Sequence, residues 1–378
     1  MNVIDRPAPP WQVDRWFNTS RPLSLDALRG IAALAVVFWH WQHFFFQGAA
    51  PGPLQREDQP LYSLFSLFYR HGGDAVSLFF SLSGFIFFWL FARALAQREI
   101  SGKQFFSERF SRIYPLHLAT FLAVAMLQKI YSAHTGNAFV YPFNDAWHAL
   151  LNVFLAPAWG LEQGWSFNGP AWSISVEVLL YAGFFLLWRY SPAPLLISAL
   201  LIAVSLWLFP AQYKISLGVF GFFCGGLAYI AVDWLLRRFD LRWVAAGLVL
   251  TCVAGWWWIG SDEAQSQRIR FAVLFPLTIV AVAACHPWLQ PLARRLSWLG
   301  DISYASYLLH FPLQIVAALL ADKFLPGRAV FYQPWSLLLF FAVLIGSSLL
   351  CHYWFERPLQ RWLRERAGGR TAGAEVAR

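Results

Sequence analysis

The sequence predicts an all-α integral membrane protein, a bundle of about ten transmembrane helices whose N- and C-termini are both cytoplasmic. Hydrophobic residues make up 58% of the 378 residues and charged residues only 13%, about half of the ~25% typical of a soluble domain. Aromatic residues reach 19%, with 21 tryptophans, and tryptophan is enriched where a membrane meets water. The scarce charge and the abundant aromatic side chains indicate that most of the surface faces lipid.

Ten segments are apolar over about the 20 residues that a membrane-spanning helix needs. In chain order they are residues 28–46, 74–96, 112–131, 172–190, 193–209, 215–236, 241–259, 270–287, 302–321 and 335–355. The further apolar stretch 146–157 is too short to cross a membrane. We expect it to lie at the interface or to re-enter the membrane.

The lysines and arginines predict the orientation, because these residues are enriched in cytoplasmic loops. With the N-terminus inside, most of the 29 fall on the cytoplasmic side, and the outer loop 132–171 contains none. We therefore expect a cytoplasmic arm over 1–24, a transmembrane domain over 25–358 and a partly disordered cytoplasmic tail over 359–378. These loops explain the net charge of +9. No long basic run exists, so we expect no nucleic-acid partner.

The first segment carries two ionisable residues, Arg29 and His40, eleven positions apart. That spacing is close to three helical turns, so both side chains lie on one face, about 16 Å apart along the axis. Arg29 near the cytoplasm would suit the phosphate of a carrier. His40, deeper in, would suit a general base or a transient acyl nucleophile. Alternatively, Arg29 only follows the positive-inside rule and His40 satisfies a buried hydrogen bond.

Arg109 and Arg112 lie three positions apart at the cytoplasmic start of the third segment, so they are neighbours on a helix face. Two guanidinium groups side by side would clamp a phosphate. Read alone, the pair is also an ordinary topology signal.

Small and acidic residues occur inside two other segments. Ser81, Ser83 and Gly84 in the second segment favour close approach of a neighbouring helix. Glu177 in the fourth segment needs a partner or a proton, because a buried charge is costly. Its depth matches that of His40, so a contact between the two is one hypothesis.

In the ninth segment, Ser303, Tyr307 and His310 follow one another at i, i+4 and i+7. This spacing predicts a polar stripe along one helix face. The stripe suits a hydrogen-bonded ladder between helices as well as it suits catalysis.

No metal site is expected. The remaining histidines lack the spacing of metal ligands, and the sequence contains no HExxH motif, P-loop or nucleophile elbow. The four cysteines lie singly in apolar segments, as small buried residues do.

Taken in order, these motifs resemble the acyltransferase-3 family of integral membrane acyltransferases, in its stand-alone form without a fused extracytoplasmic hydrolase-like domain. The matching blocks are Leu25-Asp26-Ala27-Leu28-Arg29-Gly30 with His40, Phe79-Phe80-x-Leu82-Ser83-Gly84-Phe85, Arg109-x-x-Arg112-Ile113-x-Pro115, Trp172-Ser173 with Glu177 and Tyr181, Ile302-Ser303-Tyr304 with Tyr307-Leu308-Leu309-His310, and Glu356-Arg357-Pro358. The sequence departs from many relatives at His117, where they have tyrosine, and at Val178, where they have a second glutamate.

The resemblance implies a ten-helix acyltransferase domain that takes acyl groups, often acetyl, from acyl-CoA as donor substrate, with no permanently bound cofactor. It implies as acceptor a hydroxyl of a glycan, of a lipid-linked or exported saccharide, or of a small natural product. His40 is the implied catalytic residue, assisted by Arg29, and Asp26, Asp74 or Glu177 would orient its imidazole. Arg109 and Arg112, with Arg29 and Ser83, are the implied acyl-CoA-binding residues.

The expected location is the cytoplasmic (inner) membrane of a bacterium, in contact with membrane lipids and alongside glycan biosynthesis or export partners. A proton-coupled transporter or a flippase of a polar lipid or sugar is the alternative, because buried arginine, histidine and glutamate also suit transport. A scaffold without chemistry would not need these costly residues.

Overall fold

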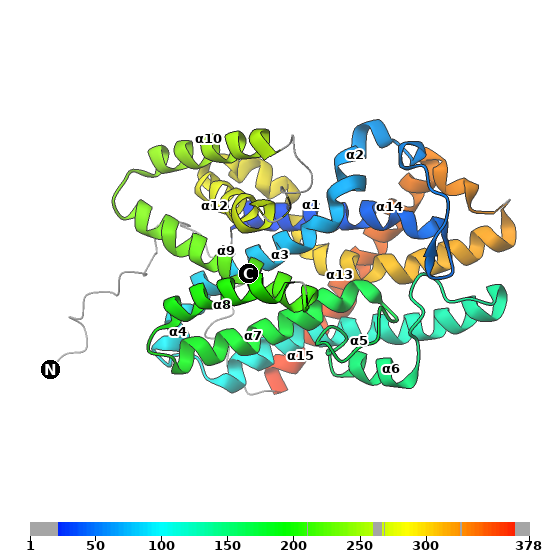
Figure 1. Ribbon diagram of the computed structural model, residues 1–378, viewed down its shortest axis with the longest axis horizontal. Coiled ribbons are helices and arrows are strands. Elements are labelled where there is room, and N and C mark those ends of the chain that lie inside the picture. The colour runs from blue at the N-terminus through cyan, green and yellow to red at the C-terminus, as the bar shows by residue number, and fades with distance from the viewer. Residues whose placement is uncertain (1–21, 210, 260–266, 268, 326, 367–378) are drawn as a thin grey trace.

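The computed structural model describes residues 22–209, 211–259, 267, 269–325 and 327–366 (Figure 1). Its helices are α1 (Leu23–His40), α2 (Tyr62–His71), α3 (Ala75–Leu90), α4 (Ala92–Ala96), α5 (Gly102–Thr135), α6 (Ala146–Val153), α7 (Trp172–Tyr190), α8 (Pro194–Leu208), α9 (Tyr213–Leu236), α10 (Leu241–Ile259), α12 (Phe275–Ala284), α13 (His286–Phe324), α14 (Pro334–Cys351) and α15 (Arg357–Arg366). Most of the expected N-terminal arm and the end of the tail lie outside the described residues.

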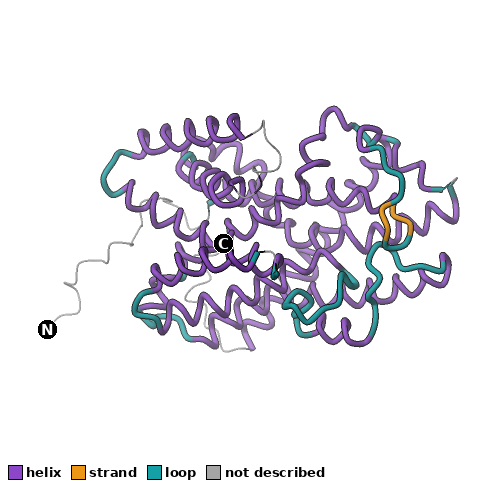
Figure 2. The backbone as a smooth tube through the Cα atoms, viewed as in Figure 1, coloured by secondary structure: helices purple, strands orange, loops and turns teal. Residues whose placement is uncertain are grey.

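Short 3-10 and π segments connect several of these helices. The 3-10 segments are η1 (Trp41–Phe45), η2 (Arg56–Asp58), η3 (Gly72–Asp74), η4 (Gly169–Ala171) and η6 (Arg328–Tyr332), and the π segments are η5 (Arg270–Leu274) and η7 (His352–Glu356). In the described part, the β-structure is one small antiparallel pair, β1 (Phe46–Gln47) with β2 (Ala50–Pro51), drawn in orange in Figure 2.

The all-α membrane fold class is confirmed. Eight helices of the described chain are long and apolar enough to cross a membrane: Leu23–Phe45, Tyr62–Leu90, Gly102–Thr135, Gly169–Tyr190, Tyr213–Leu236, Leu241–Trp258, His286–Phe324 and Pro334–Arg366. The two remaining predicted segments form the shorter apolar helices Pro194–Leu208 and Arg270–Ala284. Each of the ten predicted segments is therefore helical, while ten crossings and cytoplasmic termini stay predictions. The stretch from residue 146 forms only the eight-residue helix α6.

Local sequence signals fix the ends of α5. Ser101 precedes the helix, and its hydroxyl accepts a hydrogen bond from the backbone N–H of Gln104, which satisfies one of the free donors of the first turn. The helix ends at Thr135, and the next residue, Gly136, has a left-handed φ of 77°, a conformation that favours glycine. These caps place Arg109 and Arg112 within the first three turns of a long helix.

The most extensive helix pair joins α1 to α13, two segments that lie side by side although far apart in sequence. A Cβ atom on Gly30 would collide with the Leu299 side chain and the backbone of Gly300, and one on Gly300 would collide with Asp26. The two backbones thus touch directly, which only residues without side chains allow.

The contact between α3 and α9 also depends on glycines that let two backbones touch. A Cβ atom on Gly84 would collide with the Phe222 carbonyl, and one on Gly225 with the Ser81 carbonyl. This confirms the close helix packing expected at Gly84 and Ser81. Ser83 differs, because its hydroxyl bonds Glu177 on another helix.

The outside of the bundle carries large apolar side chains. Four tryptophans are each more than three-quarters exposed: Trp207, Trp243, Trp257 and Trp354. Helix α10 lies at the edge of the bundle (Figure 1), and only 17% of its apolar stretch is buried. Such exposure is costly in water but not in lipid.

Candidate functional site

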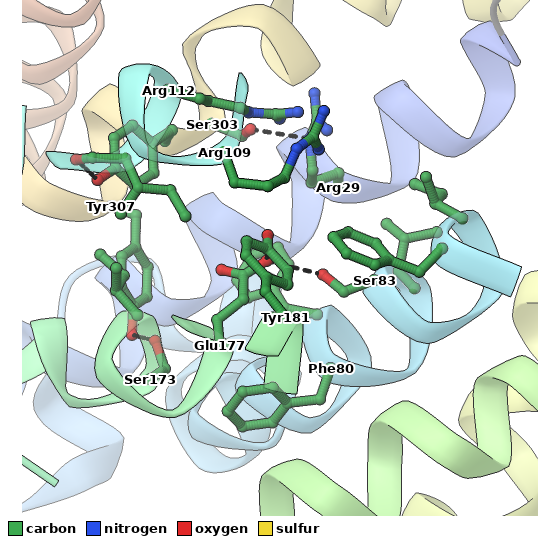
Figure 3. Close-up of a pocket in the computed structure, with 17 residues that line it drawn as sticks. Arg29, Phe80, Ser83, Arg109, Arg112, Ser173, Glu177, Tyr181, Ser303 and Tyr307 are labelled. Carbon is green, nitrogen blue, oxygen red and sulfur yellow. Dashed lines mark hydrogen bonds between the residues drawn. The ribbon is translucent and has the colours of Figure 1, made fainter. Parts of the chain in front are cut away.

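A cavity of about 120 Å³ lies between α1, α3, α5, α7 and α13, and we call it the arginine cavity (Figure 3). Its walls combine aromatic and aliphatic side chains with a few polar ones. The polar lining residues are Arg29, Ser83, Arg109, Arg112, Ser173, Glu177, Tyr181, Ser303, Tyr304 and Tyr307. Figure 3 shows the three arginines gathered on one side of the cavity, apart from Glu177, Ser83 and Tyr181. All four predicted acyl-CoA-binding residues therefore line one cavity.

Arg29 is held firmly on α1. Its guanidinium pairs with Asp26 at 3.1 Å, donates to the Ser303 hydroxyl at 3.1 Å and donates to the Gly300 carbonyl at 2.9 Å. Asp26 thus neutralises and orients Arg29, and α13 fixes its position.

Arg109 and Arg112 keep more of their donors available. The Nε atom of Arg109 is buried without a hydrogen-bond partner among the described residues, and its nearest carboxylate, Glu108, lies 3.9 Å away. Its guanidinium also lies 5.0 Å from the centre of the Phe91 ring, within cation–π range. Within the described chain, Arg112 forms no ion pair or hydrogen bond, and its side chain is exposed at the cavity rim. This pair can bind an anion that enters the cavity.

Glu177 faces the arginine cavity from α7. It accepts hydrogen bonds from the Ser83 hydroxyl at 3.0 Å and from the Tyr181 hydroxyl. Although its depth along the bundle suggested a contact with His40, the two residues line different cavities.

His40 lines a second, larger cavity of about 900 Å³, which we call the histidine cavity. This cavity opens at exposed residues, among them Arg56 and Glu57. His40 itself is 6% exposed. Its Nδ1 atom lies 3.1 Å from Nε2 of His310, and its backbone carbonyl accepts from the Gln314 side chain at 2.8 Å.

The partner of the His40 ring is therefore an imidazole and not one of the three expected carboxylates. Asp26 pairs with Arg29, Glu177 lies in the arginine cavity, and Asp74 pairs with Arg270 at 3.3 Å. His310 belongs to the polar stripe seen in the sequence, but the spacing gave no sign that it would meet His40. Gln314, one turn further along α13, was missed.

The structure confirms that Arg29 and His40 share one face of α1. Arg29 contacts α13 through Ser303, and His40 contacts α13 through His310. In the predicted stripe, Ser303 and His310 thus contact α1, and Tyr307 between them lines both cavities.

Comparisons with known proteins identify the family of this chain. The sequence model described as "Acyltransferase domain" matches residues 23–357. The chain is 27% identical over 389 aligned residues to "Acyltransferase MdmB" of Streptomyces mycarofaciens, covering 92% of this chain and 94% of that protein. It is 33% identical over 107 residues to "Protein 2 in picA locus" of Rhizobium radiobacter, covering 28% of this chain and 44% of that protein. No solved structure matches the chain. Because the family match spans the helical bundle from α1 to the start of α15, the chain belongs to the acyltransferase-3 family and is an integral membrane acyltransferase.

Proposed function

We propose that the protein transfers an acyl group, acetyl in the first instance, from cytoplasmic acyl-CoA to a hydroxyl of a glycan or of a lipid-linked or exported saccharide. The proposed location is the bacterial cytoplasmic membrane, where glycan biosynthesis or export partners would supply or remove the acceptor. One observation carries the proposal: a cavity lined by three arginines and a cavity lined by His40 follow one another along the same face of α1. Family membership favours this reading over a transporter.

In this proposal the arginine cavity receives the donor. Coenzyme A carries phosphate groups at one end and a thioester at the end of a thin arm. Arg109 and Arg112 would bind the phosphates through charge-assisted hydrogen bonds. Arg29, already neutralised by Asp26, would contribute directed N–H groups more than net charge. The Ser83 hydroxyl, fixed by Glu177, would contact the arm.

His40 would then act as general base on the acceptor. The acceptor oxygen attacks the thioester carbonyl carbon, Nε2 of His40 takes the hydroxyl proton, and the C–S bond breaks. The proton then passes from the imidazolium to the leaving thiolate, so that the products are the acyl ester and free coenzyme A. For Nε2 to be the base, Nδ1–H of His40 must donate to Nε2 of His310, and the distance of 3.1 Å permits this.

The test replaces His40 with alanine in the full-length membrane protein. We expect transfer from acetyl-CoA to fall by at least ~100-fold, the lower range of general-base catalysis. Mass analysis of surface glycans and secreted metabolites from a deletion strain, complemented with each variant, would identify the missing acyl ester. His134→Ala, which changes an exposed histidine at the end of α5, is the matched control. Full acylation by a correctly folded His40→Ala protein would contradict the proposed role.

A further inference from the structure

Tyr307 stands at the boundary between the arginine cavity and the histidine cavity. Among the described residues it is the one that lines both. Its side chain comes from α13 and is 5% exposed. A carrier arm that enters beside the arginines therefore meets this ring before it reaches His40.

Two hydrogen bonds hold the Tyr307 hydroxyl across the boundary. It donates to the Pro170 carbonyl at 2.7 Å and lies 2.8 Å from the Ser173 hydroxyl. Since a phenol has one proton to donate, Ser173 must be the donor in the second bond. Pro170 lines the histidine cavity and Ser173 lines the arginine cavity. The Tyr307 hydroxyl is therefore hydrogen-bonded to one lining residue of each cavity.

The helices around the two cavities pack closely against one another. α1 and α13 touch backbone to backbone at Gly30 and Gly300, and α3 touches α9 in the same way at Gly84. The ring of Tyr307, by contrast, packs edge-on against Phe79 with 6.0 Å between ring centres, and its hydroxyl is held by the two bonds above. Rotation of this one side chain is a smaller change than separation of any of these helices.

We propose that Tyr307 is a closed barrier between the donor and acceptor cavities, and that its side chain must rotate away before the thioester and His40 can meet. Its function as a barrier in acyl transfer rests on the proposed function, since that assigns the donor to one cavity and the acceptor to the other. In the closed state the ring keeps water of the larger cavity from the thioester. This protection matters because water can replace the acceptor hydroxyl in the same attack.

The barrier can be tested without any chemistry on a substrate. Ile86, which lines the arginine cavity alone, is changed to cysteine in a protein whose Cys224, Cys252, Cys285 and Cys351 are replaced by alanine. A small membrane-impermeant thiol reagent is added on the side where the histidine cavity opens. With Tyr307 present we expect slow labelling of the new cysteine.

Tyr307→Phe keeps the ring and removes both hydroxyl bonds. We expect labelling at position 86 to rise roughly tenfold, which corresponds to about 1.4 kcal/mol, and Tyr307→Ala to give a larger rise. Tyr304→Phe is the matched control, because Tyr304 lies one turn earlier on α13, lines only the arginine cavity and donates to the Ile113 carbonyl. Fast labelling with Tyr307 intact, or equal labelling in all variants, would overturn the barrier.

A second measurement separates this inference from the proposed function. Without acceptor, Tyr307→Phe should release coenzyme A from acetyl-CoA roughly tenfold faster than the parent protein, in line with the labelling. If the labelling responds but no variant releases coenzyme A or forms an ester, the proposed function fails and the barrier stands. If the parent forms the ester and the labelling does not respond, the barrier fails and the proposed function stands.

Discussion

His310 lies 3.1 Å from His40 through Nε2 and Nδ1, and the two rings stack at 24° with their centres 4.9 Å apart. This pair gives the proposed base a neutral orienting partner. An imidazole can hold the required tautomer by hydrogen bonding, but it lacks the negative charge with which a carboxylate would stabilise an imidazolium.

Replacement of His310 with alanine should therefore lower kcat for acyl transfer roughly tenfold or more and leave KM for acetyl-CoA nearly unchanged. The arginine cavity does not include His310, so donor binding should not change. His310→Gln, which can still accept a hydrogen bond from His40, should recover part of the rate. Steady-state kinetics of both variants make the measurement, and an equal loss in the two would argue against an orienting role.

Replacement of Arg109 or Arg112 with alanine should act mainly on the donor. Each loses a charge-assisted hydrogen bond worth about 1.5–3 kcal/mol, so KM for acyl-CoA should rise roughly 10- to 100-fold. Lys103→Ala removes an equal charge from an exposed position at the start of α5 and controls for general electrostatics. A rise as large in Lys103→Ala would show that the charge of this face, rather than the arginine pair, attracts the donor.

Acetyl-CoA should stabilise the purified protein against thermal unfolding. At a concentration about 100 times Kd, a ligand that binds only the folded state adds about 2.7 kcal/mol. An adenine nucleotide without the acylated arm should stabilise less, and the double variant Arg109→Ala/Arg112→Ala should lose most of the effect. A transporter of a polar lipid or sugar would show no response to acetyl-CoA, so the melting curves also separate the two functions.

Replacement of Gly30 with alanine should destabilise the bundle by about 1–3 kcal/mol, the usual cost of overpacking. The new methyl group would collide with Leu299 and with the backbone of Gly300. Gly247→Ala is the control, because a Cβ atom there meets no other atom within 4 Å. In that helix interior the change should stabilise by up to ~1 kcal/mol. Thermal unfolding in detergent compares the two, and equal melting temperatures would contradict the backbone contact.

The helices could be predicted because a membrane-spanning segment is marked by its own composition. The ends were less predictable, since a helix continues into the polar interface where hydropathy no longer marks it. The predicted segment 112–131 is α5, which runs from Gly102 to Thr135, and the predicted segment 302–321 is α13, which runs from His286 to Phe324. The predicted segment 74–96 divides at Phe91 into α3 and α4.

The site was predictable along each helix but not between helices. Spacing placed Arg29 and His40 on one face, since both belong to the same helix. It could not say which carboxylate or imidazole another helix would bring alongside. Glu177 matched His40 in depth, yet α7 turns it toward Ser83. Depth gives only the position of a residue along the membrane normal. Its position in the membrane plane depends on how the helices pack and rotate.

The backbone contact between Gly30 and Gly300 also sets a length scale. This contact makes α1 and α13 one rigid pair of helices. Arg29 and His40 are both fixed on that pair, about 16 Å apart along the axis of α1. This fixed distance would then select donors by length. A donor must be long enough for its anionic end to stay at the arginines while its carbonyl carbon reaches the imidazole. A short thioester could not contact the arginines and the imidazole at the same time, whatever its intrinsic reactivity. The length of the donor, and not only its charge, would therefore decide which donor is used.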